Sequence, residues 1–450
     1  MAVLRRGTSA LVGVVASALV LTGCAAGSET TTEETTSSSS GGGSAETCTT
    51  PTVVTMLGTI KVEIQDQFKD AVAEYNSANT DCVEVKIIES AADQTFLANI
   101  TPLYEAGEAP VIAYTLQELP DMAPRVMDWT GTPLAALAAA GTLDTATIDG
   151  KILGIPSTVE AFGLLYNKAV LDEAGVDPAA IKTRADLEAA FQAVEATGRD
   201  AIHFSGLWWS LGAHFTNIYH TTAADTREGR LGILDELKAG SYDLLSDPAF
   251  VNWLDTFDLL KAYSNDEASI ADDDYDKGVF NLADGEAGFW FMGNWAEPNL
   301  LGELPDGEFG VMPVPTSNNA SDYGMDGISV GVPGYFVIDA EQSTEEERAG
   351  AQAFLSWFLT TPEGQARWAG PIEAGGMNFI PVYSGFTVAP ETYMAGVISD
   401  YVNAGKSLQW VNSSYPAGLQ ENYGAAAQKY YNGVSDRAAF AEELAEAWTK

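Results

Sequence analysis

Residues 149–177 read DGKILGIPSTVEAFGLLYNKAVLDEAGVD. Gly154-Ile155-Pro156 is typical of a turn, because glycine tolerates unusual backbone angles and proline fixes φ. The apolar run Ala161–Tyr166 that follows favours a buried strand. The stretch therefore predicts a chain that turns at residues 154–156 and then enters the interior of the protein.

Strand and helix patterns alternate on both sides of this stretch. Apolar residues recur at helical spacing from Ile64 to Tyr75, and Thr183 with Asp186 forms a capping box at the start of another helix. Strands are expected at 53–57, 83–88, 111–114, 161–166 and 288–292, and further helices at 349–359, from 362 onwards and at 437–448. This alternation predicts an α/β protein.

An ordered set of motifs resembles one known family. Glu160 is followed by Leu165-Tyr166-Asn167-Lys168 and then by Ala174-Gly175-Val176-Asp177. Three later stretches keep the family's order: Phe280–Trp295, which ends in Gly293-Asn294-Trp295; Phe354–Trp368, which contains Thr361-Pro362-Glu363-Gly364; and Ile380-Pro381-Val382. Over about residues 50 to 450 the chain resembles the family 1 extracellular solute-binding proteins of ABC importers.

The resemblance implies an α/β protein of the periplasmic-binding-protein type II fold, with two lobes and a ligand cleft between them. One lobe would take residues 49–158 and 331–372, and the other residues 159–330 and 373–450. A chain of 450 residues exceeds the usual span of a single hydrophobic core, which agrees with two lobes. Hinge closure between such lobes can bury most of a small ligand.

The charge of the chain narrows the class of ligand. There are 22 Lys and Arg residues against 63 Asp and Glu, which gives a net charge of −41. Nucleic acid is not an expected partner, because phosphate binding needs clustered cations. An anionic solute would be repelled as it approached. A neutral small molecule suits this surface, and the resemblance implies a carbohydrate.

The first residues have the pattern of a bacterial lipoprotein signal. Arg5 and Arg6 precede the apolar run Leu11–Leu21, which is too short to span a membrane. Leu21-Thr22-Gly23-Cys24 resembles a lipobox, so residues 1–23 are predicted to be removed and Cys24 to carry the lipid. The alternative is an ordinary signal peptide with an incidental cysteine.

Residues 24–48 are rich in Ser, Thr and Gly and contain few apolar residues. Such a segment cannot bury enough surface to fold, so we expect a flexible tether. The protein is therefore expected at the extracellular face of the cytoplasmic membrane, held there by its lipid anchor alone.

Cys48 and Cys82 are the cysteines that remain after Cys24. Each lies just before a predicted strand, and a predicted helix separates the two strands. In a strand–helix–strand unit the strands run parallel, so their starts lie at the same edge of the sheet. Exported proteins commonly form disulfides. We predict a bridge between Cys48 and Cys82, with two free thiols as the alternative.

Candidate ligand-binding residues follow from the chemistry of sugars. Aromatic rings stack on the C–H faces of a sugar, and carboxylates and amides accept hydrogen bonds from its hydroxyls. The resemblance implies stacking by Trp295 and by one of the adjacent pair Trp208 and Trp209, and a hydroxyl contact by Glu160. The other candidates are Gln117 and Glu118, which follow a predicted strand, and the aromatic residues Tyr335 and Trp410. For the aromatic candidates the alternative is packing in the core.

A hydrolase pattern is present but incomplete. Gly327-Ile328-Ser329-Val330-Gly331 matches the nucleophile elbow, whose catalytic triad needs a histidine after the serine. His203, His214 and His220 all precede Ser329, so we do not expect catalysis.

The acidic run Asp272–Asp276 suggests calcium but does not fit an EF-hand loop. Positions 6 and 12 of such a loop require Gly and Glu, and here they are Lys277 and Ala283. We expect neither a metal nor another cofactor.

The sequence therefore predicts a monomeric, lipid-anchored protein that captures a carbohydrate, expected to be an oligosaccharide, and delivers it to the transmembrane subunits of an ABC permease. Two alternatives remain open. One is a secreted carbohydrate-active enzyme, which would need two carboxylates flanking a sugar bond. The other is the same fold with a solute that is not a sugar.

The lipobox generates a test of the anchor. We predict that Cys24→Ala prevents lipidation, because the substitution removes the thiol that would receive the lipid. The variant should appear in the medium or as an unprocessed precursor, as measured by cell fractionation and N-terminal peptide mass. Membrane retention equal to that of the parent would contradict the assignment.

Overall fold

The computed structural model describes residues 48, 50–58, 61, 64–90, 95–115, 118–139, 141–264, 275–416 and 418–449. Residues Cys48–Lys450 form one compact unit. The predicted signal peptide, Cys24 and the tether up to residue 47 lie outside the described residues, as do Gln117 and residues 272–274. Within the described ranges, no helix is both long enough and apolar enough to cross a bilayer.

The first of two main sheets has five strands in the order β2-β1-β3-β12-β6. β1 runs parallel to β2 and β3, whereas β12 runs antiparallel to β3 and β6. The strands are β1 (Thr52–Leu57), β2 (Val83–Ile88), β3 (Ile112–Thr115), β12 (Tyr335–Ile338) and β6 (Ile155–Pro156). A separate ribbon pairs β4 (Thr147–Ile148) with β5 (Lys151–Ile152).

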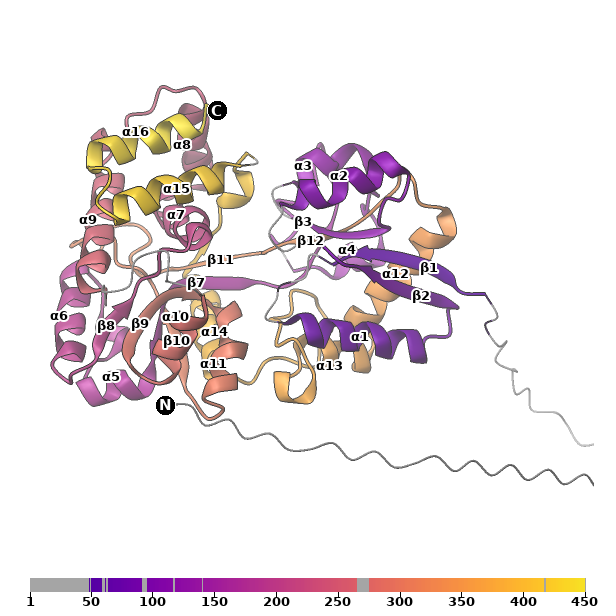
Figure 1. The fold of residues 1–450 in the computed structure, drawn as a ribbon, viewed down its shortest axis with the longest axis horizontal. Coiled ribbons are helices and arrows are strands. Elements are labelled where there is room, and N and C mark those ends of the chain that lie inside the picture. Colours follow the sequence, from indigo (N-terminus) through magenta and orange to yellow (C-terminus); the bar gives the residue numbers. More distant parts are fainter. Residues whose placement is uncertain are drawn as a thin grey trace, which may run out of the picture. The chain divides into compact units, whose positions relative to one another are not determined.

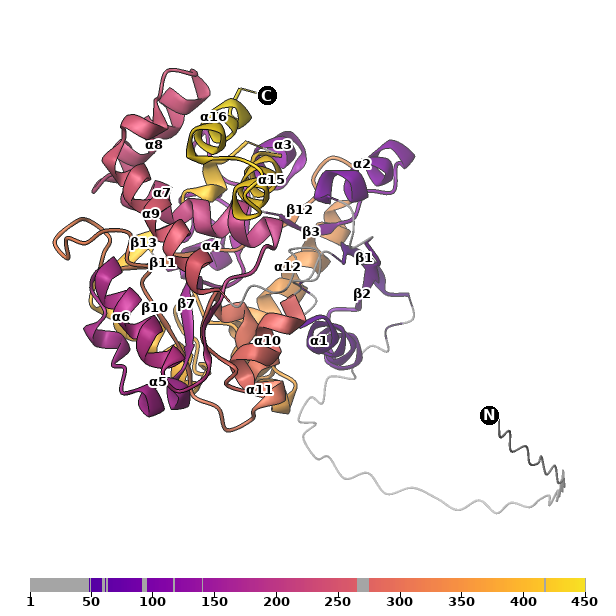
Figure 2. The ribbon, with the colours of Figure 1, turned by 60° about the vertical axis from the view of Figure 1, so that its left-hand side comes forward.

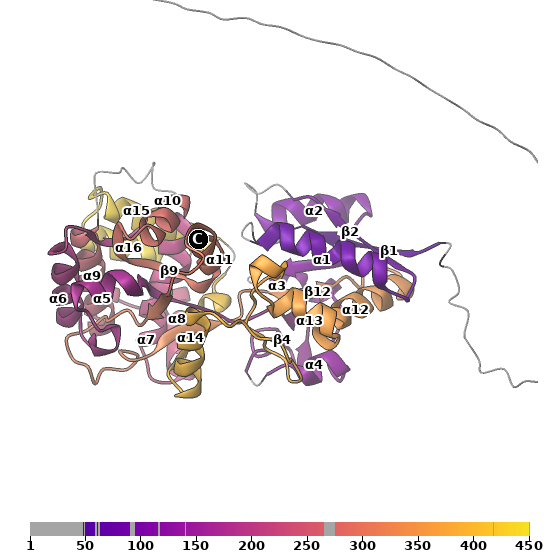
Figure 3. The ribbon, with the colours of Figure 1, turned by 90° about the horizontal axis from the view of Figure 1, so that it is seen from below.

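Helices cover both faces of the first sheet (Figure 1). Side chains alternate along β12: Phe336 and Ile338 join one core with α1, α12 and α13, and Tyr335 and Val337 join another with α2 and α3. The helices are α1 (Gln65–Ala78), α2 (Phe96–Ala106), α3 (Leu119–Met122), α4 (Pro133–Leu137), α12 (Glu345–Thr360) and α13 (Pro362–Ala369). Figure 3 shows α12 and α13 beside α1 and β1, although they are far apart in sequence.

The second sheet has six strands, with β7 at its centre. The main order is β13-β11-β7-β9-β8, and β10 pairs with β7. The strands are β7 (Glu160–Asn167), β8 (Asp200–His203), β9 (Ala287–Gly293), β10 (Phe309–Met312), β11 (Ile328–Gly331) and β13 (Ser407–Gln409). Every residue of β7 is buried, as the apolar run in the sequence predicted.

Ten helices in the described ranges pack in the lobe of the second sheet, and Figure 2 shows α15 beside α16. They are α5 (Lys168–Ala174), α6 (Arg184–Glu195), α7 (Thr216–Thr222), α8 (Arg227–Lys238), α9 (Pro248–Tyr263), α10 (Tyr275–Ala283), α11 (Glu297–Glu303), α14 (Tyr393–Asn403), α15 (Leu419–Tyr431) and α16 (Arg437–Ala447). The predicted capping box at Thr183 and Asp186 is present at the start of α6.

The segments of the chain that connect the two sheets are hydrogen-bonded to one another. Both the backbone N–H and the hydroxyl of Ser157 donate to the carbonyl of Gly334, at 3.1 Å each. The hydroxyl of Thr158 donates to the carbonyl of Ile380 at 2.9 Å. The turn expected at Gly154-Ile155-Pro156 is not present, because Ile155 and Pro156 pair with β12 and form β6. The chain after β6 leads directly into the segment that joins it to β7.

The segment after α13 remains with the first sheet for longer than the expected boundary at residue 372. Met377, Val382 and Tyr383 are buried in the same core as Trp368. Within this segment Ile380 packs against the core of the second sheet, and Met394 is the next residue buried in that core. The reason is physical: Met377, Val382 and Tyr383 bury their apolar area against the first sheet instead of exposing it.

A disulfide joins Cys48 to Cys82, as predicted, with a Cα–Cα distance of 5.4 Å. β1 and β2 are parallel and in register from Thr52↔Val83, so the cysteine just before β2 comes close to the chain that enters β1. A hydrogen bond from the N–H of Thr52 to the carbonyl of Cys82, at 2.9 Å, also joins the starts of β1 and β2.

The disulfide spans 34 positions in the sequence. In the chain-entropy account, a loop of this length contributes about 3–4 kcal/mol to the free energy of unfolding. We predict a loss of this size for the double variant C48S/C82S, measured by denaturant unfolding of the mature protein. Two alkylatable thiols in the native, unreduced parent would contradict the bridge.

Candidate functional site

A cavity of about 260 Å³ lies where residues of both lobes meet. We call it the tryptophan cavity. It combines three indole rings with a carboxylate, an ammonium group and two amides, a mixture of apolar and hydrogen-bonding groups that suits a small polar ligand. Its lining residues are Lys61, Glu160, Trp209, Ala213, His214, Trp295, Pro333, Trp410, Asn412 and Gln420.

Trp295 is placed by the two residues before it. Gly293 ends β9 directly under the indole, and a Cβ there would lie 2.1 Å from a ring carbon, so only glycine leaves room for the ring. The side-chain oxygen of Asn294 accepts a hydrogen bond from the N–H of Ala161 at 2.8 Å, which fixes the turn against β7. Trp295 is 8% exposed and takes part in the core while one part of it faces the cavity.

Glu160 opens β7 and is only 4% exposed. Its carboxylate forms an ion pair with the ammonium group of Lys61. The same ammonium group lies 5.1 Å from the centre of the Trp295 ring, within the range of a cation–π contact. Glu160, Lys61 and Trp295 therefore form one charge-balanced cluster on the cavity wall.

Trp410 forms another wall. Gly331, at the end of β11, makes room for it, because a Cβ there would lie 2.3 Å from the indole. The side-chain oxygen of Asn217 accepts hydrogen bonds from the N–H groups of Val411 and Asn412, at 3.0 and 3.1 Å. This amide holds the loop that presents both Trp410 and Asn412 to the cavity.

His214 joins the aromatic walls. It lies in a π-helical segment, Ser210–Phe215, a geometry that often marks functional positions. Its ring centre is 4.7 Å from that of Trp295, 5.6 Å from that of Trp209 and 6.4 Å from that of Trp410. Burial, and to a smaller degree the charge of Lys61, lowers the pKa of His214 to about 3. The imidazole is therefore neutral at pH 7.

Three buried polar atoms of residues that line the cavity have no hydrogen-bond partner among the described residues. They are Nδ1 of His214, Nε1 of Trp410 and Oδ1 of Asn412. Because these atoms are shielded from the cavity as well as from solvent, they offer no contact to an occupant in this conformation.

The structure brings four of the predicted residues into this cavity: Glu160, Trp209, Trp295 and Trp410. Trp208 is 41% exposed and does not line the cavity, whereas Trp209 does. Glu118 instead accepts a hydrogen bond from the hydroxyl of Thr115 at 3.0 Å. The remaining candidate, Gln117, lies outside the described residues.

Tyr335 is also not in the tryptophan cavity. It is 1% exposed, and its hydroxyl donates to the carbonyl of Thr142 at 2.8 Å. With Trp410 it lines a different cavity of about 230 Å³, which lies against β11 and β13. Its contacts are those of a packed structural tyrosine.

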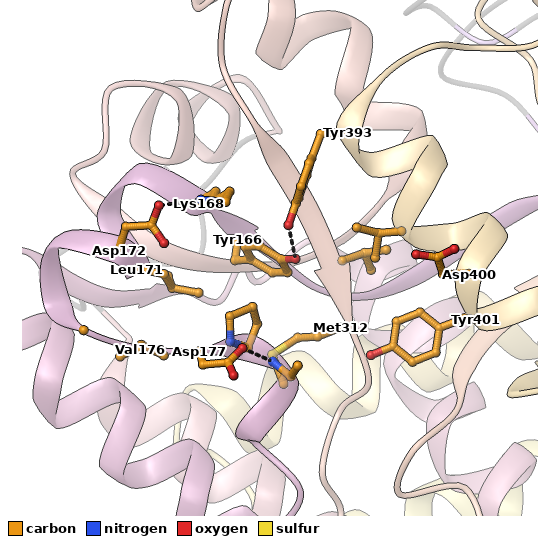
Figure 4. A pocket seen from close by; sticks show the side chains of 15 residues that line it. Tyr166, Lys168, Leu171, Asp172, Val176, Asp177, Met312, Tyr393, Asp400 and Tyr401 are labelled. Carbon is orange, nitrogen blue, oxygen red and sulfur yellow. Dashed lines mark hydrogen bonds and ion pairs between the residues drawn. The ribbon is translucent and has the colours of Figure 1, made fainter. Parts of the chain in front are cut away.

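A larger cavity of about 530 Å³ lies beside β7, β10 and α14 (Figure 4). Four of its polar side chains interact in pairs: the hydroxyls of Tyr166 and Tyr393 are 3.5 Å apart, and Lys168 forms an ion pair with Asp172. None of the predicted ligand-binding residues lines it. We therefore assign the candidate site to the smaller cavity, where the aromatic rings and the carboxylate converge.

The hydrolase pattern does not form a nucleophile elbow. Ser329 lies inside β11, paired with Phe162 of β7, instead of on the strand-to-helix turn of a nucleophile elbow. In the part of the chain that the structure describes, no group of three His, Cys, Asp or Glu side chains is arranged to hold a metal ion.

The sequence profile of the bacterial extracellular solute-binding proteins matches residues 70–392. The chain belongs to this family. The family consists of binding proteins and is extracellular, which agrees with the predictions of a binding protein instead of an enzyme and of a location outside the cell.

Similar proteins support the same fold. The structure of the solute-binding protein RafE in complex with raffinose has a TM-score of 0.72 at 16% identity, over 88% of this chain and 99% of that one. A family 1 extracellular solute-binding protein from Bifidobacterium longum subsp. infantis has a TM-score of 0.64 at 19% identity, over 89% of this chain and 99% of that one. These likenesses show the two-lobed α/β fold.

One relative is similar at the level of sequence. The arabinooligosaccharide-binding protein of Halalkalibacterium halodurans is 31% identical over 144 residues, which are 30% of this chain. The match spans 32% of that relative's length.

Sequence reasoning missed four of the polar residues at the cavity: Lys61, His214, Asn412 and Gln420. Lys61 follows β1, where ligands bind in open α/β sheets, and this position was an available signal. His214 lies five residues after Trp209 in a helical segment, which was a second signal. Asn412 and Gln420 reach the cavity only through tertiary packing.

The low pKa of His214 generates a test. An unfolded imidazole has a pKa of about 6.5, so between pH 6.5 and 3 the unfolded chain binds a proton that the folded chain does not. Stability should therefore fall as the pH is lowered through this window, by at most about 1.4 kcal/mol per pH unit for this histidine. We expect H214Q to lose this part of the pH slope in denaturant unfolding at pH 7, 6 and 5.

His220 provides a parallel measurement. Burial lowers its pKa to about 3 as well, but it packs against Tyr415 and Tyr423 and does not line the tryptophan cavity. H220Q should lose a similar part of the slope. A parent and an H214Q variant with the same pH slope would show that His214 ionises normally.

Proposed function

We propose that this protein captures a carbohydrate, specifically an oligosaccharide, in the tryptophan cavity and delivers it to an ABC permease. The observation that carries the proposal is the convergence of three indoles from separate segments, at positions 209, 295 and 410, around the carboxylate of Glu160. Indole faces suit the C–H faces of sugar rings, and a carboxylate suits paired hydroxyls. Several rings in one cavity favour a ligand of more than one sugar unit.

The similar proteins support a sugar as the ligand class. One of them is described as binding arabinooligosaccharides, and another was solved with raffinose bound. A net charge of −41 adds a physical reason, because a neutral solute approaches such a surface without repulsion.

Movement of two lobes relative to one another would let a ligand enter the cavity and then enclose it. In this proposal one lobe contains the first sheet and the chain as far as Val388, and the other contains the second sheet with α14–α16. Bending at segments 157–159 and 332–334 would open and close the cavity. A lipid at Cys24 and a tether would keep the monomeric binding protein close to the permease.

The direct test is calorimetric titration of the mature protein with a panel of neutral oligosaccharides, monosaccharides, polyols and peptides. We expect saturable binding of at least one oligosaccharide and no turnover of it, as followed by chromatography of the recovered ligand. Hydrolysis of the ligand would identify an enzyme, and binding confined to peptides or polyols would overturn the sugar assignment.

The adjacent tryptophans give a matched pair of variants. Trp209→Ala removes an indole from the cavity and should weaken oligosaccharide binding by roughly 2–4 kcal/mol, as for an aromatic anchor. Trp208→Ala removes an exposed indole one residue away and should leave the affinity unchanged. Equal losses in the two variants would place the ligand elsewhere.

Glu160→Gln tests the carboxylate in the same assay. It should cost up to about 1.5 kcal/mol of binding free energy, because a neutral amide oxygen accepts a hydroxyl hydrogen bond more weakly than a carboxylate does. Melting temperatures measured on every variant separate a weaker contact from a damaged fold. This matters most for Trp295→Ala, since Trp295 packs against Phe162 and His214 as well as facing the cavity.

A further inference from the structure

Lys61 occupies the place where a ligand would contact Trp295 and Glu160. It comes from the loop between β1 and α1, in the lobe of the first sheet, whereas Glu160 begins β7 and Trp295 follows β9, both in the second sheet. Its ammonium group forms the ion pair with Glu160 and lies 5.1 Å from the centre of the Trp295 ring. One side chain thus bridges the two lobes across the cavity.

The bridge uses the two groups that the proposed function assigns to the sugar. The carboxylate of Glu160 is satisfied by a cation, and the ring of Trp295 receives the same cation instead of C–H groups. A solvent-exposed ion pair is worth little, but the Glu160 side chain is only 5% exposed and that of Lys61 is 28% exposed, so this pair is largely shielded from water. Its formation therefore competes with any ligand that needs Glu160 and Trp295.

We infer that Lys61 is an intramolecular competitor, which closes the two lobes over the cavity in the absence of ligand and must leave Glu160 and Trp295 before a carbohydrate can bind. The inference rests on the proposed function for the identity of the ligand, but not for the bridge itself. The apparent dissociation constant rises as the fraction of binding-competent molecules falls, so the bridge weakens binding without contributing a contact to the ligand.

Lys61→Met tests the inference, because it keeps the length of the side chain and removes the charge. We expect the variant to bind the oligosaccharide selected by the parent roughly three- to tenfold more tightly, the range given by an ion pair together with a cation–π contact. The affinity of the parent should rise with ionic strength, because salt weakens a contact that binding must break. The affinity of the variant should be nearly independent of salt.

Lys69→Met is the matched control. Lys69 lies on α1, eight positions further along, and pairs with Glu89 at 3.4 Å, with 40% of its side chain exposed. The K69M variant loses the same charge as K61M, but at a position away from the cavity. Its affinity for the oligosaccharide and the salt dependence of that affinity should therefore match those of the parent. A gain in K69M equal to that in K61M would assign the effect to net charge and overturn the inference.

A measurement without ligand separates the bridge from the proposed function. Small-angle X-ray scattering of the ligand-free mature protein should give a larger radius of gyration for K61M than for the parent or K69M, because the loss of the bridge lets the lobes separate. Equal radii, or weaker carbohydrate binding by K61M, would overturn the inference. If the parent binds no carbohydrate while the radii still differ, the proposed function fails and the bridge stands.

Discussion

The register of β7 with β11 and with β9 determines the geometry of the candidate site. β11 places Gly331 opposite Glu160, and β9 places Gly293 opposite Phe162. Each glycine lies under an indole that a Cβ would displace, Trp410 in one case and Trp295 in the other. A slip of one residue would turn every side chain of β7 to the opposite face, so the carboxylate and both rings depend on these two strand pairings.

The crossing segments hold this register in place. Ser157 is tied to Gly334 just before β7 begins, and the hydroxyl of Tyr114 lies 3.0 Å from that of Ser157, which extends the network into β3. The same bonds fix where β11 gives way to β12. The segments proposed as hinges are therefore also those that align the strands of the site.

The sequence predicted the elements whose signals are local. The capping box at Thr183, the proline that begins α13 and the apolar run 161–166 of β7 depend on neighbouring residues alone, and each is present. Glu160 and Trp295 were identified from their motifs. Asn412 and Gln420 were not, because each reaches the cavity through the packing of distant segments. The boundary expected at residue 372 had no local marker, and the burial of Met377 and Tyr383 was needed to place that segment with the first sheet.

The carboxylate of Glu160 needs a hydrogen-bonding or charged partner both with and without a ligand in the cavity. A carboxylate as buried as that of Glu160 is costly without a compensating partner, so some group must satisfy it whether or not a ligand is present. Lys61 meets that need from the opposite lobe, and a sugar hydroxyl would meet it from within the cavity. Because one partner replaces the other, Glu160 need not remain unpaired in either state. The affinity of the site then depends on the difference between two sets of contacts, and the more stable the Lys61 bridge, the more a ligand must gain from Trp209, Trp410 and the amides.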